Sequence, residues 1–235
     1  MPAALHPTIG LLQSSSLSRV VQQEIERAIL AGDYPPGSKL SEAALAEKLG
    51  VSRGPVREAF RMLDEAGLVR SEKNRGVFVR AIPMDEALEI FDLRAAMDEW
   101  VGKRLAESIT AEQVRELKAL VAEMEEAVKA QDARLYHLAN LRFHDRMVEM
   151  VGNRKLTDTY RRLIKELSLF RRQNLADAVL MRTFLSEHKK IVKAIASGDG
   201  QAAARAMLEH VMQSKQRTLA NDVLQRGLAP SASGR

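Results

Sequence analysis

Four of the five histidines lie in the second half of the chain, where their spacing could support metal binding. His137, Asn140 and His144 recur on one face of one predicted helix, and His188 and His210 fall on two later helices. Imidazoles from three helices that converge in a bundle core, with a side-chain oxygen as the fourth ligand, could bind a divalent ion. The alternative is that each histidine is a single polar residue, satisfied by a neighbour or by water.

Three arginines in the first half are spaced for a different chemistry. Arg53, Arg57 and Arg61 follow one another at intervals of four on a predicted helix, so they share one face. The planar fork of an arginine can satisfy O6 and N7 of guanine together. Ser52, at the start of this helix, could hold a phosphate through its hydroxyl and the backbone N–H. The alternative is that the arginines are solvated surface charges.

The region after this helix resembles a basic β-wing. Two β-like runs, residues 67–70 and 77–80, flank a polar turn at residues 71–76. Lys39 and Arg75 are placed to contact phosphate or the minor groove, and Gly76 permits close approach of the backbone. A helix, a turn, a second helix and a wing together place one helix in the DNA major groove.

The elements that position these residues can be read from apolar periodicity and chain breaks. A helical stripe runs from Leu17 to near Gly32, and the prolines of the run YPPG at residues 34–37 end it. Ser41 caps a short helix, and the arginine helix starts at Ser52, tolerates Pro55 in its first turn and ends at Gly67.

The remainder of the chain is predicted to be helical, with no strand pattern. Helices are expected over residues 85–108, 111–130, 133–151, 154–174, 178–197 and 200–222, with a capping box formed by Thr110 and Gln113. The predicted organisation is a flexible N-terminal tail (1–16), a winged helix-turn-helix domain (17–82), an all-helical effector-binding and dimerisation domain (83–222) and a flexible C-terminal tail (223–235). The fold class is therefore mainly α, with a small β-wing, and Ile82-Pro83 is the expected hinge.

Composition narrows the class of protein. The chain has 235 residues, a net charge of +5 and a pI near 9.5, which is consistent with a polyanionic partner. The lack of cysteine excludes disulfides and thiolate metal sites. Neither a membrane-length apolar run nor a secretory signal is recognisable, so we expect a cytoplasmic protein with no membrane partner.

Residues 17–80 resemble the winged helix-turn-helix of the GntR family of bacterial transcription regulators. The resemblance rests on YPPGSKLSEAALAEKLGVSRGPVREAFRMLDEAGLV and on NRGVFV. It implies DNA contacts for Ser52, Arg53, Arg57 and Gly76. The sequence departs from some relatives after Glu42, where Ala43 replaces an arginine that touches DNA, so a different base preference is expected.

Residues 85–222 resemble the helical FCD domain of the FadR-like branch of that family. The matching stretches are FDLRAAMDEW, NLRFHDRMVEMVGNRKL and SEHKKIVKAIASGDGQAAARAMLEHV. The resemblance implies a small-metabolite sensor and a divalent metal ion, for example zinc, nickel or manganese, held by Asn140, His144, His188 and His210. Asn140 stands where aspartate is usual, so one anionic ligand is lost and the metal preference or affinity changes.

Two further residues are predicted to contact the effector. Arg94 occupies a position that resembles a pocket-facing one, where it would pair bidentately with a carboxylate or phosphonate. Its alternative role is a surface ion pair with Asp98, four residues on. His137 lies on the same predicted face as His144 and is expected to line the pocket.

The predicted function is a sequence-specific DNA-binding regulator, a repressor of a catabolic operon. A homodimer would bind a near-palindromic double-stranded operator, and an organic acid, sugar acid or phosphonate effector would control it. Two alternatives are a metal-dependent enzyme built on the histidines and a DNA-binding protein without an effector. No general-base motif accompanies the histidines, which argues against the enzyme.

Overall fold

The computed structural model describes residues 7–173 and 180–228, and it divides into two compact units. One unit is built on the residues before Met84, with Ile164–Gln173 grouped with it, and the other on the helices from Met84 onward. The division falls directly after the predicted hinge at Ile82-Pro83. Parts of the two predicted tails and of the predicted helix 178–197 fall on residues 1–6, 174–179 and 229–235, which lie outside the described residues.

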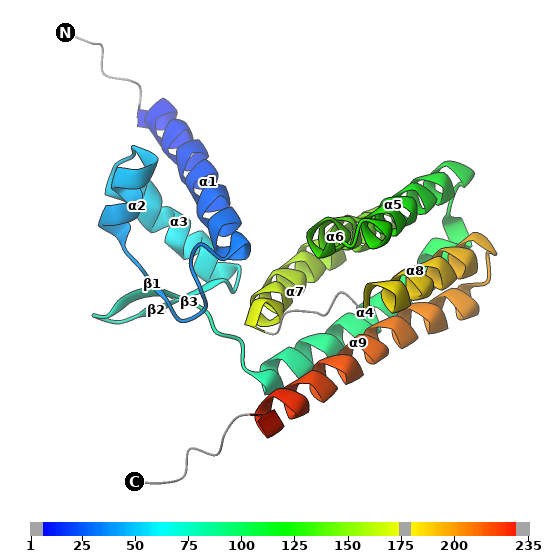
Figure 1. Cartoon of the computed structure of the whole chain (residues 1–235). Coiled ribbons are helices and arrows are strands. Elements are labelled where there is room, and N and C mark those ends of the chain that lie inside the picture. The colour runs from blue at the N-terminus through cyan, green and yellow to red at the C-terminus, as the bar shows by residue number, and fades with distance from the viewer. Residues whose placement is uncertain (1–6, 174–179, 229–235) are drawn as a thin grey trace. The chain divides into compact units, whose positions relative to one another are not determined.

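The part of the first unit before Met84 is built on α1 (Pro7–Ala31), α2 (Glu42–Leu49) and α3 (Arg53–Glu65) (Figure 1). The prediction that a tail extends to residue 16 is wrong, because α1 begins at Pro7. Proline is tolerated in the first turn of a helix, where its missing N–H has no partner to lose. Ser41 caps α2 as predicted, and Gly50 ends α2 in the left-handed region, with φ of 65°.

Three short antiparallel strands complete this unit: β1 (Lys39–Leu40), β2 (Val69–Glu72) and β3 (Gly76–Val79). Their order in the sheet is β1-β3-β2. Phe78 of the central strand β3 lies opposite Lys39 of β1 on one side and opposite Arg70 of β2 on the other. The hairpin of β2 and β3 confirms the predicted wing. The two-residue strand β1 was not predicted, because so short a segment has no alternation of its own to detect.

The core of the first unit lies where α1 packs against α3. Ile25 and Ile29 of α1 and Val56 and Leu63 of α3 are buried almost completely. The apolar face of α3 is therefore turned inward, and its opposite face is left for polar side chains.

The second unit is all helical and contains α4 (Met84–Ser108), α5 (Ala111–Lys129), α6 (Ala133–Met150), α8 (Met181–Ala196) and α9 (Gly200–Leu228). It also contains the first part of α7 (Arg154–Gln173), up to Leu163. The predicted helices agree with these to within a few residues at each end, and the capping box of Thr110 and Gln113 is present. The exception is α9, which continues past the predicted end at residue 222. No proline occurs between residue 200 and Pro230 to stop it earlier.

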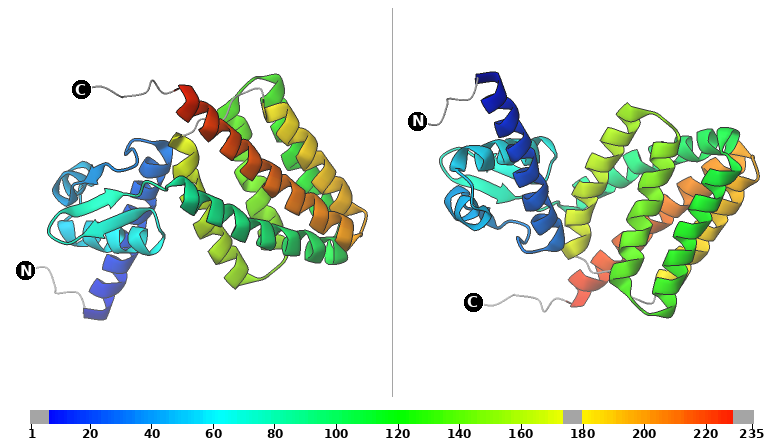
Figure 2. Two further views of the ribbon diagram at one scale, coloured as in Figure 1. Left: turned by 90° about the horizontal axis from the view of Figure 1, so that it is seen from below. Right: turned by 90° about the horizontal axis from the view of Figure 1, so that it is seen from above.

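Helices α4 and α9 lie along one another in the second unit (Figure 2). Gly102 of α4 explains how closely they approach, because a Cβ there would lie 2.7 Å from the backbone oxygen of Ala203. Apolar side chains from several helices fill the core of this unit, among them Leu105, Leu117 and Met124.

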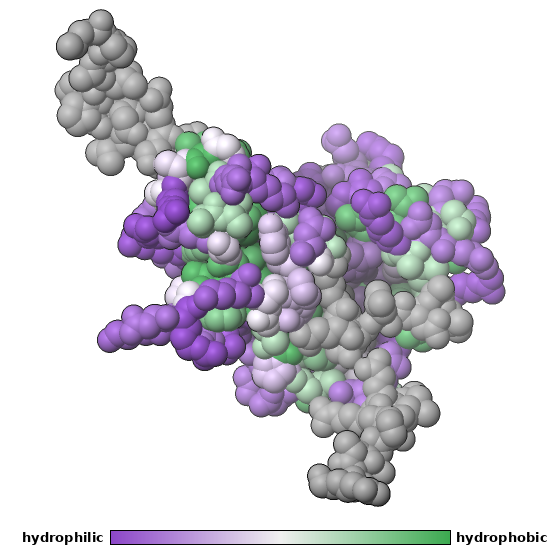
Figure 3. Space-filling model, turned by 60° about the vertical axis from the view of Figure 1, so that its left-hand side comes forward, coloured by the Kyte–Doolittle hydropathy of each residue, from purple (hydrophilic) through white to green (hydrophobic). Residues whose placement is uncertain are grey.

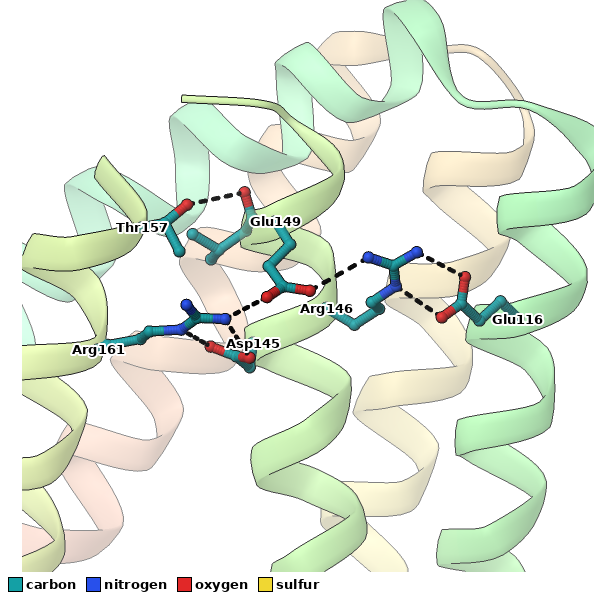
Figure 4. Close-up of polar contacts among 7 residues, drawn as sticks. Glu116, Asp145, Arg146, Glu149, Thr157 and Arg161 are labelled. Carbon is teal, nitrogen blue, oxygen red and sulfur yellow. Dashed lines mark hydrogen bonds and ion pairs between the residues drawn. The ribbon is translucent and has the colours of Figure 1, made fainter. Parts of the chain in front are cut away.

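Charged residues join the outer sides of α5, α6 and α7 (Figure 4). Arg146 of α6 binds Glu116 of α5 with two hydrogen bonds of 2.6 and 3.2 Å. Arg161 of α7 pairs in the same way with Asp145 of α6, at 2.6 and 2.8 Å, and Glu149 contacts both arginines.

On the face shown in Figure 3, hydrophilic residues cover much of the described surface, with apolar residues scattered among them. No helix in the described ranges is long and apolar enough to cross a membrane.

Candidate functional sites: a DNA-binding face and a buried histidine cluster

The predicted DNA-reading arginines lie on the outer face of α3. Arg53, Arg57 and Arg61 are all exposed, whereas Val56 and Phe60 on the opposite face are buried. The four-residue spacing of the arginines and the apolar residues between them produce this separation. The structure therefore confirms that the three guanidinium groups share one accessible face.

Two serines at helix starts in this unit behave differently. Ser41 accepts a hydrogen bond from the Ala44 backbone N–H at 3.3 Å, whereas Ser52 caps α3 without a side-chain hydrogen bond. Ser52 is exposed at the positive end of the α3 dipole. Its hydroxyl and the first backbone N–H groups of α3 are therefore placed to bind an anion such as a phosphate.

Arg57 has a partner that the sequence interpretation missed. Its Nε and one terminal nitrogen donate to the two carboxylate oxygens of Glu42, at 3.1 and 2.9 Å. The Glu42 hydrogen bonds raise the pKa of Arg57, which stays charged. Sequence could not reveal the pair, because fifteen residues and a turn separate its members.

Basic side chains gather around the wing. Lys39 of β1, Arg70 of β2 and Arg75 of the hairpin turn lie 6.0, 6.0 and 5.8 Å from the centre of the Phe78 ring. Glu72 pairs with Arg70 at 3.0 Å and with Arg75 at 2.5 Å. The strand pairing of β1 with β3 thus brings Lys39 to the predicted wing residues.

Gly76 is required at the base of the wing turn. Its φ is 109°, a backbone angle that residues other than glycine rarely adopt. A Cβ there would lie 2.9 Å from Lys39 Cε. The structure therefore brings together Lys39, Arg75 and Gly76 on one edge of the first unit, as a compact basic surface.

The second candidate site is a cluster of three buried histidines. His144 of α6, His188 of α8 and His210 of α9 are 3%, 0% and 6% exposed. One ring nitrogen from each lies within 4.8 Å of the others, and the Nε2 atoms of His144 and His188 are 3.3 Å apart. The structure therefore brings the three imidazoles together in the core of the helical unit.

Protein partners hold the outward-facing ring nitrogens. Tyr136 Oη lies 3.2 Å from His188 Nδ1, and Glu187 Oε2 lies 2.8 Å from His210 Nδ1. Arg217 in turn donates two hydrogen bonds to Glu187, at 2.7 and 3.0 Å. Hydrogen bonds of this kind fix the orientation of metal-binding imidazoles, so the donor set and its surroundings fit a divalent ion.

Burial disfavours the charged forms of His188 and His210, and the neutral imidazole is the form that binds a metal. Burial is the main cause that lowers the pKa of His188 well below its usual value, and the nearby groups His210 and Arg94 add to it. Burial also lowers the pKa of His210, although Glu187 opposes the shift. Burial alone would raise the pKa of Glu187, but hydrogen bonds from His210 and Arg217 outweigh it and lower that pKa.

Arg94 lies beside the histidine cluster. Its guanidinium is 3.2 Å from Asp98 Oδ2, 3.3 Å from Tyr160 Oη and 3.3 Å from His144 Nε2. The predicted pair with Asp98 is present but is not on the surface, because the two side chains are 3% and 0% exposed. Burial would lower the pKa of Arg94, but Tyr160 and Asp98 outweigh that effect and raise it.

The remaining predicted residues differ in their positions. Asn140 lies one turn before His144 on α6 and is half-buried, so it stays a predicted fourth ligand. His137 is exposed and is not one of the three clustered histidines, and it stays a predicted effector contact. The buried stripe of α6 runs through Tyr136, Ala139 and Phe143, and His137 lies on its flank.

Two family models match this chain, one in each part. Residues 17–79 match the bacterial regulatory proteins of the gntR family, and residues 89–213 match the FCD domain. The transcriptional repressor RspR of Escherichia coli is 27% identical over 209 residues, which cover 89% of each chain. The galactonate operon transcriptional repressor of the same species is 26% identical over 212 residues, covering 81% of this chain and 92% of its own.

The fold is also found among solved structures. A GntR-type transcriptional regulator from Rhodococcus sp. RHA1 superposes with a TM-score of 0.75 at 26% identity, covering 87% of this chain and 98% of that chain. The matched proteins are transcription regulators, which favours this function over a metal-dependent enzyme. The chain belongs to the GntR family of bacterial transcriptional regulators, in the FadR-like branch that carries a C-terminal FCD domain.

Proposed function

We propose that this protein is a repressor whose operator binding is controlled by a small anionic metabolite, namely an organic acid, a sugar acid or a phosphonate. The observation that carries the proposal is the buried cluster of three imidazoles with the Arg94 guanidinium 3.3 Å from His144. The similarity to a repressor named for a galactonate operon supports a sugar acid and a catabolic operon.

The charges at the cluster favour an anion. His144, His188, His210 and the half-buried Asn140 would hold a divalent ion, which would supply a Lewis-acidic centre for an oxygen ligand. Asn140 contributes no negative charge, and Arg94 adds a positive one. A carboxylate or phosphonate would offset part of the positive charge of the divalent ion, and Arg94 can pair with it bidentately.

The DNA-binding face would act in a homodimer. Two copies of α3 would enter successive major grooves of a near-palindromic operator, with half-sites about 34 Å apart. Arg53 and Arg57 would contact bases, whereas Ser52, Lys39, Arg75 and the backbone at Gly76 would contact phosphate or the minor groove. Effector binding can change operator affinity only if it favours one arrangement of the two DNA-binding units over another.

Elemental analysis tests the metal site. Wild-type protein should contain about one divalent ion per chain, His188→Ala should lose most of it, and His137→Ala should keep it. His137 is the matched control because it is an exposed histidine near the start of α6, the helix that carries His144. Equal metal content in wild type and His188→Ala would contradict the metal proposal.

A ligand screen tests the regulatory part of the proposal. Thermal unfolding of the metal-loaded protein is measured with a panel of sugar acids, organic acids and phosphonates, because a ligand of the folded state raises the midpoint. Each stabilising compound is then added to an operator-binding assay, and at least one should change operator affinity. A compound that stabilises the protein through Arg94 but leaves operator affinity unchanged would refute the coupling. The shift measured for His137→Ala tests the predicted effector contact of that residue.

DNA recognition has its own test. Arg57→Ala should weaken binding to a duplex selected by the wild-type protein from a randomised library by about tenfold or more, and weaken binding to random DNA far less. Arg115→Ala, which removes an exposed arginine of the helical unit, should change neither. Equal losses on both duplexes would make Arg57 a phosphate contact.

A further inference from the structure

The two hydrogen bonds between Glu42 and Arg57 restrict how Arg57 can approach DNA. Glu42 is the first residue of α2 and Arg57 lies in the second turn of α3, so two helices fix the two ends of the pair. The Glu42 side chain is 28% exposed and that of Arg57 62%, which leaves the far edge of the guanidinium open to solvent. Glu42 thus contacts only one edge of the planar group.

The contacted edge is the one that leaves a guanine-reading fork free. Glu42 accepts from Nε and from one N–H of Nη2. The remaining donors are the two N–H groups of Nη1 and the second N–H of Nη2. Two of these point away from the side chain in parallel, with the spacing that matches O6 and N7 of guanine.

We propose that Glu42 is a specificity-determining residue that positions Arg57 so that it reads a guanine in the operator. This inference rests on the proposed entry of α3 into the major groove. Glu42 does not touch the base itself. It holds the plane of the Arg57 guanidinium before DNA arrives, so less side-chain freedom is lost when the base contact forms.

The charge of Glu42 adds to this selectivity. A carboxylate at the DNA-binding face repels phosphate, so it opposes a purely electrostatic contact between Arg57 and the backbone. The pair therefore disfavours non-specific binding while it favours the base contact, which separates specificity from affinity.

The neighbouring pair of Arg61 and Glu58 lacks this geometry and provides the matched control. Glu58 contacts Nη1 of Arg61 at 2.8 Å, and both residues lie on α3. The side chain of Arg61 is 68% exposed and that of Glu58 is 52% exposed. A single contact between neighbouring turns does not fix the plane of the guanidinium. Glu58→Gln and Glu42→Gln each remove one negative charge from the same helix pair, so they differ in positioning but not in charge.

The experiment uses the full-length protein and a duplex selected by the wild type from a randomised library. Affinity is measured for this duplex, for variants with each G·C pair replaced, and for random DNA. Glu58→Gln should tighten binding to all duplexes alike. Glu42→Gln should tighten binding to random DNA but reduce discrimination by about tenfold at one G·C pair, the pair at which Arg57→Ala also loses discrimination.

A second variant separates positioning from charge and guards against misfolding. Glu42→Asp keeps the negative charge at the start of α2 but shortens the side chain, so it should lose the same discrimination without tightening on random DNA. Unchanged discrimination in both Glu42 variants, with Arg57→Ala still losing it, would overturn this inference alone. No loss of discrimination in Arg57→Ala would instead remove the proposed base contact of Arg57.

Discussion

The two units each contain an arginine paired with a carboxylate, but solvent surrounds one pair and protein the other. Arg57 and Glu42 are 2.9 Å apart, with side chains 62% and 28% exposed. Arg94 and Asp98 are 3.2 Å apart, with side chains 3% and 0% exposed. The same chemical contact therefore has two different energetic consequences.

An exposed pair can exchange one partner for another at little cost, because water solvates whichever group is released. A buried pair cannot, because a released charge has no water to replace its partner. The open edge of the Arg57 guanidinium therefore stays in contact with water while Glu42 holds the other edge. In the helical unit, the charge of Arg94 depends on its protein partners, because its side chain is almost fully buried.

The largest effect is expected from breaking the buried pair. Asp98→Ala should lower the free energy of unfolding by about 3–5 kcal/mol, because the Arg94 charge would be left buried without its carboxylate. Urea unfolding followed by circular dichroism measures this loss. The double replacement Arg94→Met with Asp98→Leu should be more stable than Asp98→Ala, because it removes both charges and fills the space.

A loss below about 1 kcal/mol in Asp98→Ala would show that the pair behaves like a surface one, and would remove the contrast between the units. One atom sharpens the prediction further. Asp98 Oδ1 is buried and has no hydrogen-bond partner among the described residues. Part of the charge of Asp98 is thus unsatisfied already. Burial of the carboxylate raises the pKa of Asp98, although Arg94 opposes the shift.

Sequence predicted the helices that carry the two ion pairs, but it did not predict which pair would be buried. The interval of four between Arg94 and Asp98 places them on one helical face, whether or not another helix covers that face. Covering depends on how α4 packs within the bundle, and those contacts join residues far apart in the chain, such as Arg94 with Tyr160 and His144. Helix positions were predictable because caps and apolar periods are local signals.

The same limit explains the histidines. Periodicity placed His137 and His144 on one face, yet the structure buries His144 and exposes His137. Seven residues are not quite two turns, and His137 belongs to the first turns of α6, where few positions are covered. The convergence of His144, His188 and His210 followed only from the resemblance to the FCD domain, since no local pattern joins three separate helices.

An effect of intermediate size on stability is expected at one of the two serines that precede helices, Ser41, but not at Ser52. Ser41→Ala should lower stability by about 1 kcal/mol, because it removes a capping hydrogen bond of α2. Ser52→Ala should change stability less, because its side chain makes no capping bond in the described structure, but it should weaken DNA binding severalfold. Thermal unfolding and operator titration measure the two quantities. A larger stability loss for Ser52→Ala than for Ser41→Ala would contradict the assignment of a free hydroxyl to Ser52.

The charged network on the outer side of α5, α6 and α7 allows exposed and buried arginines to be compared within the helical unit itself. Arg146 is 40% exposed and binds Glu116 and Glu149 (Figure 4). Arg146→Ala should lower stability by less than about 1 kcal/mol, and the loss should shrink as salt is added. Arg94→Ala in the same unit is the control, with a loss that salt leaves nearly unchanged. A loss from Arg146→Ala that also persists in high salt would mean that the network is shielded from solvent.

The smallest effect is expected at the pair of Arg61 and Glu58 on α3. Both side chains are more than half exposed and lie three residues apart, so Glu58→Ala should change the free energy of unfolding by only about 0.2–0.5 kcal/mol. Removing the carboxylate should nevertheless tighten binding to random DNA, because a negative charge leaves the face that meets phosphate. Urea unfolding and anisotropy titration at two salt concentrations measure the two changes. If Glu58→Ala left random-DNA affinity unchanged at low salt, this side of α3 would not face the duplex, and the exposed arginines would have to be assigned a different partner.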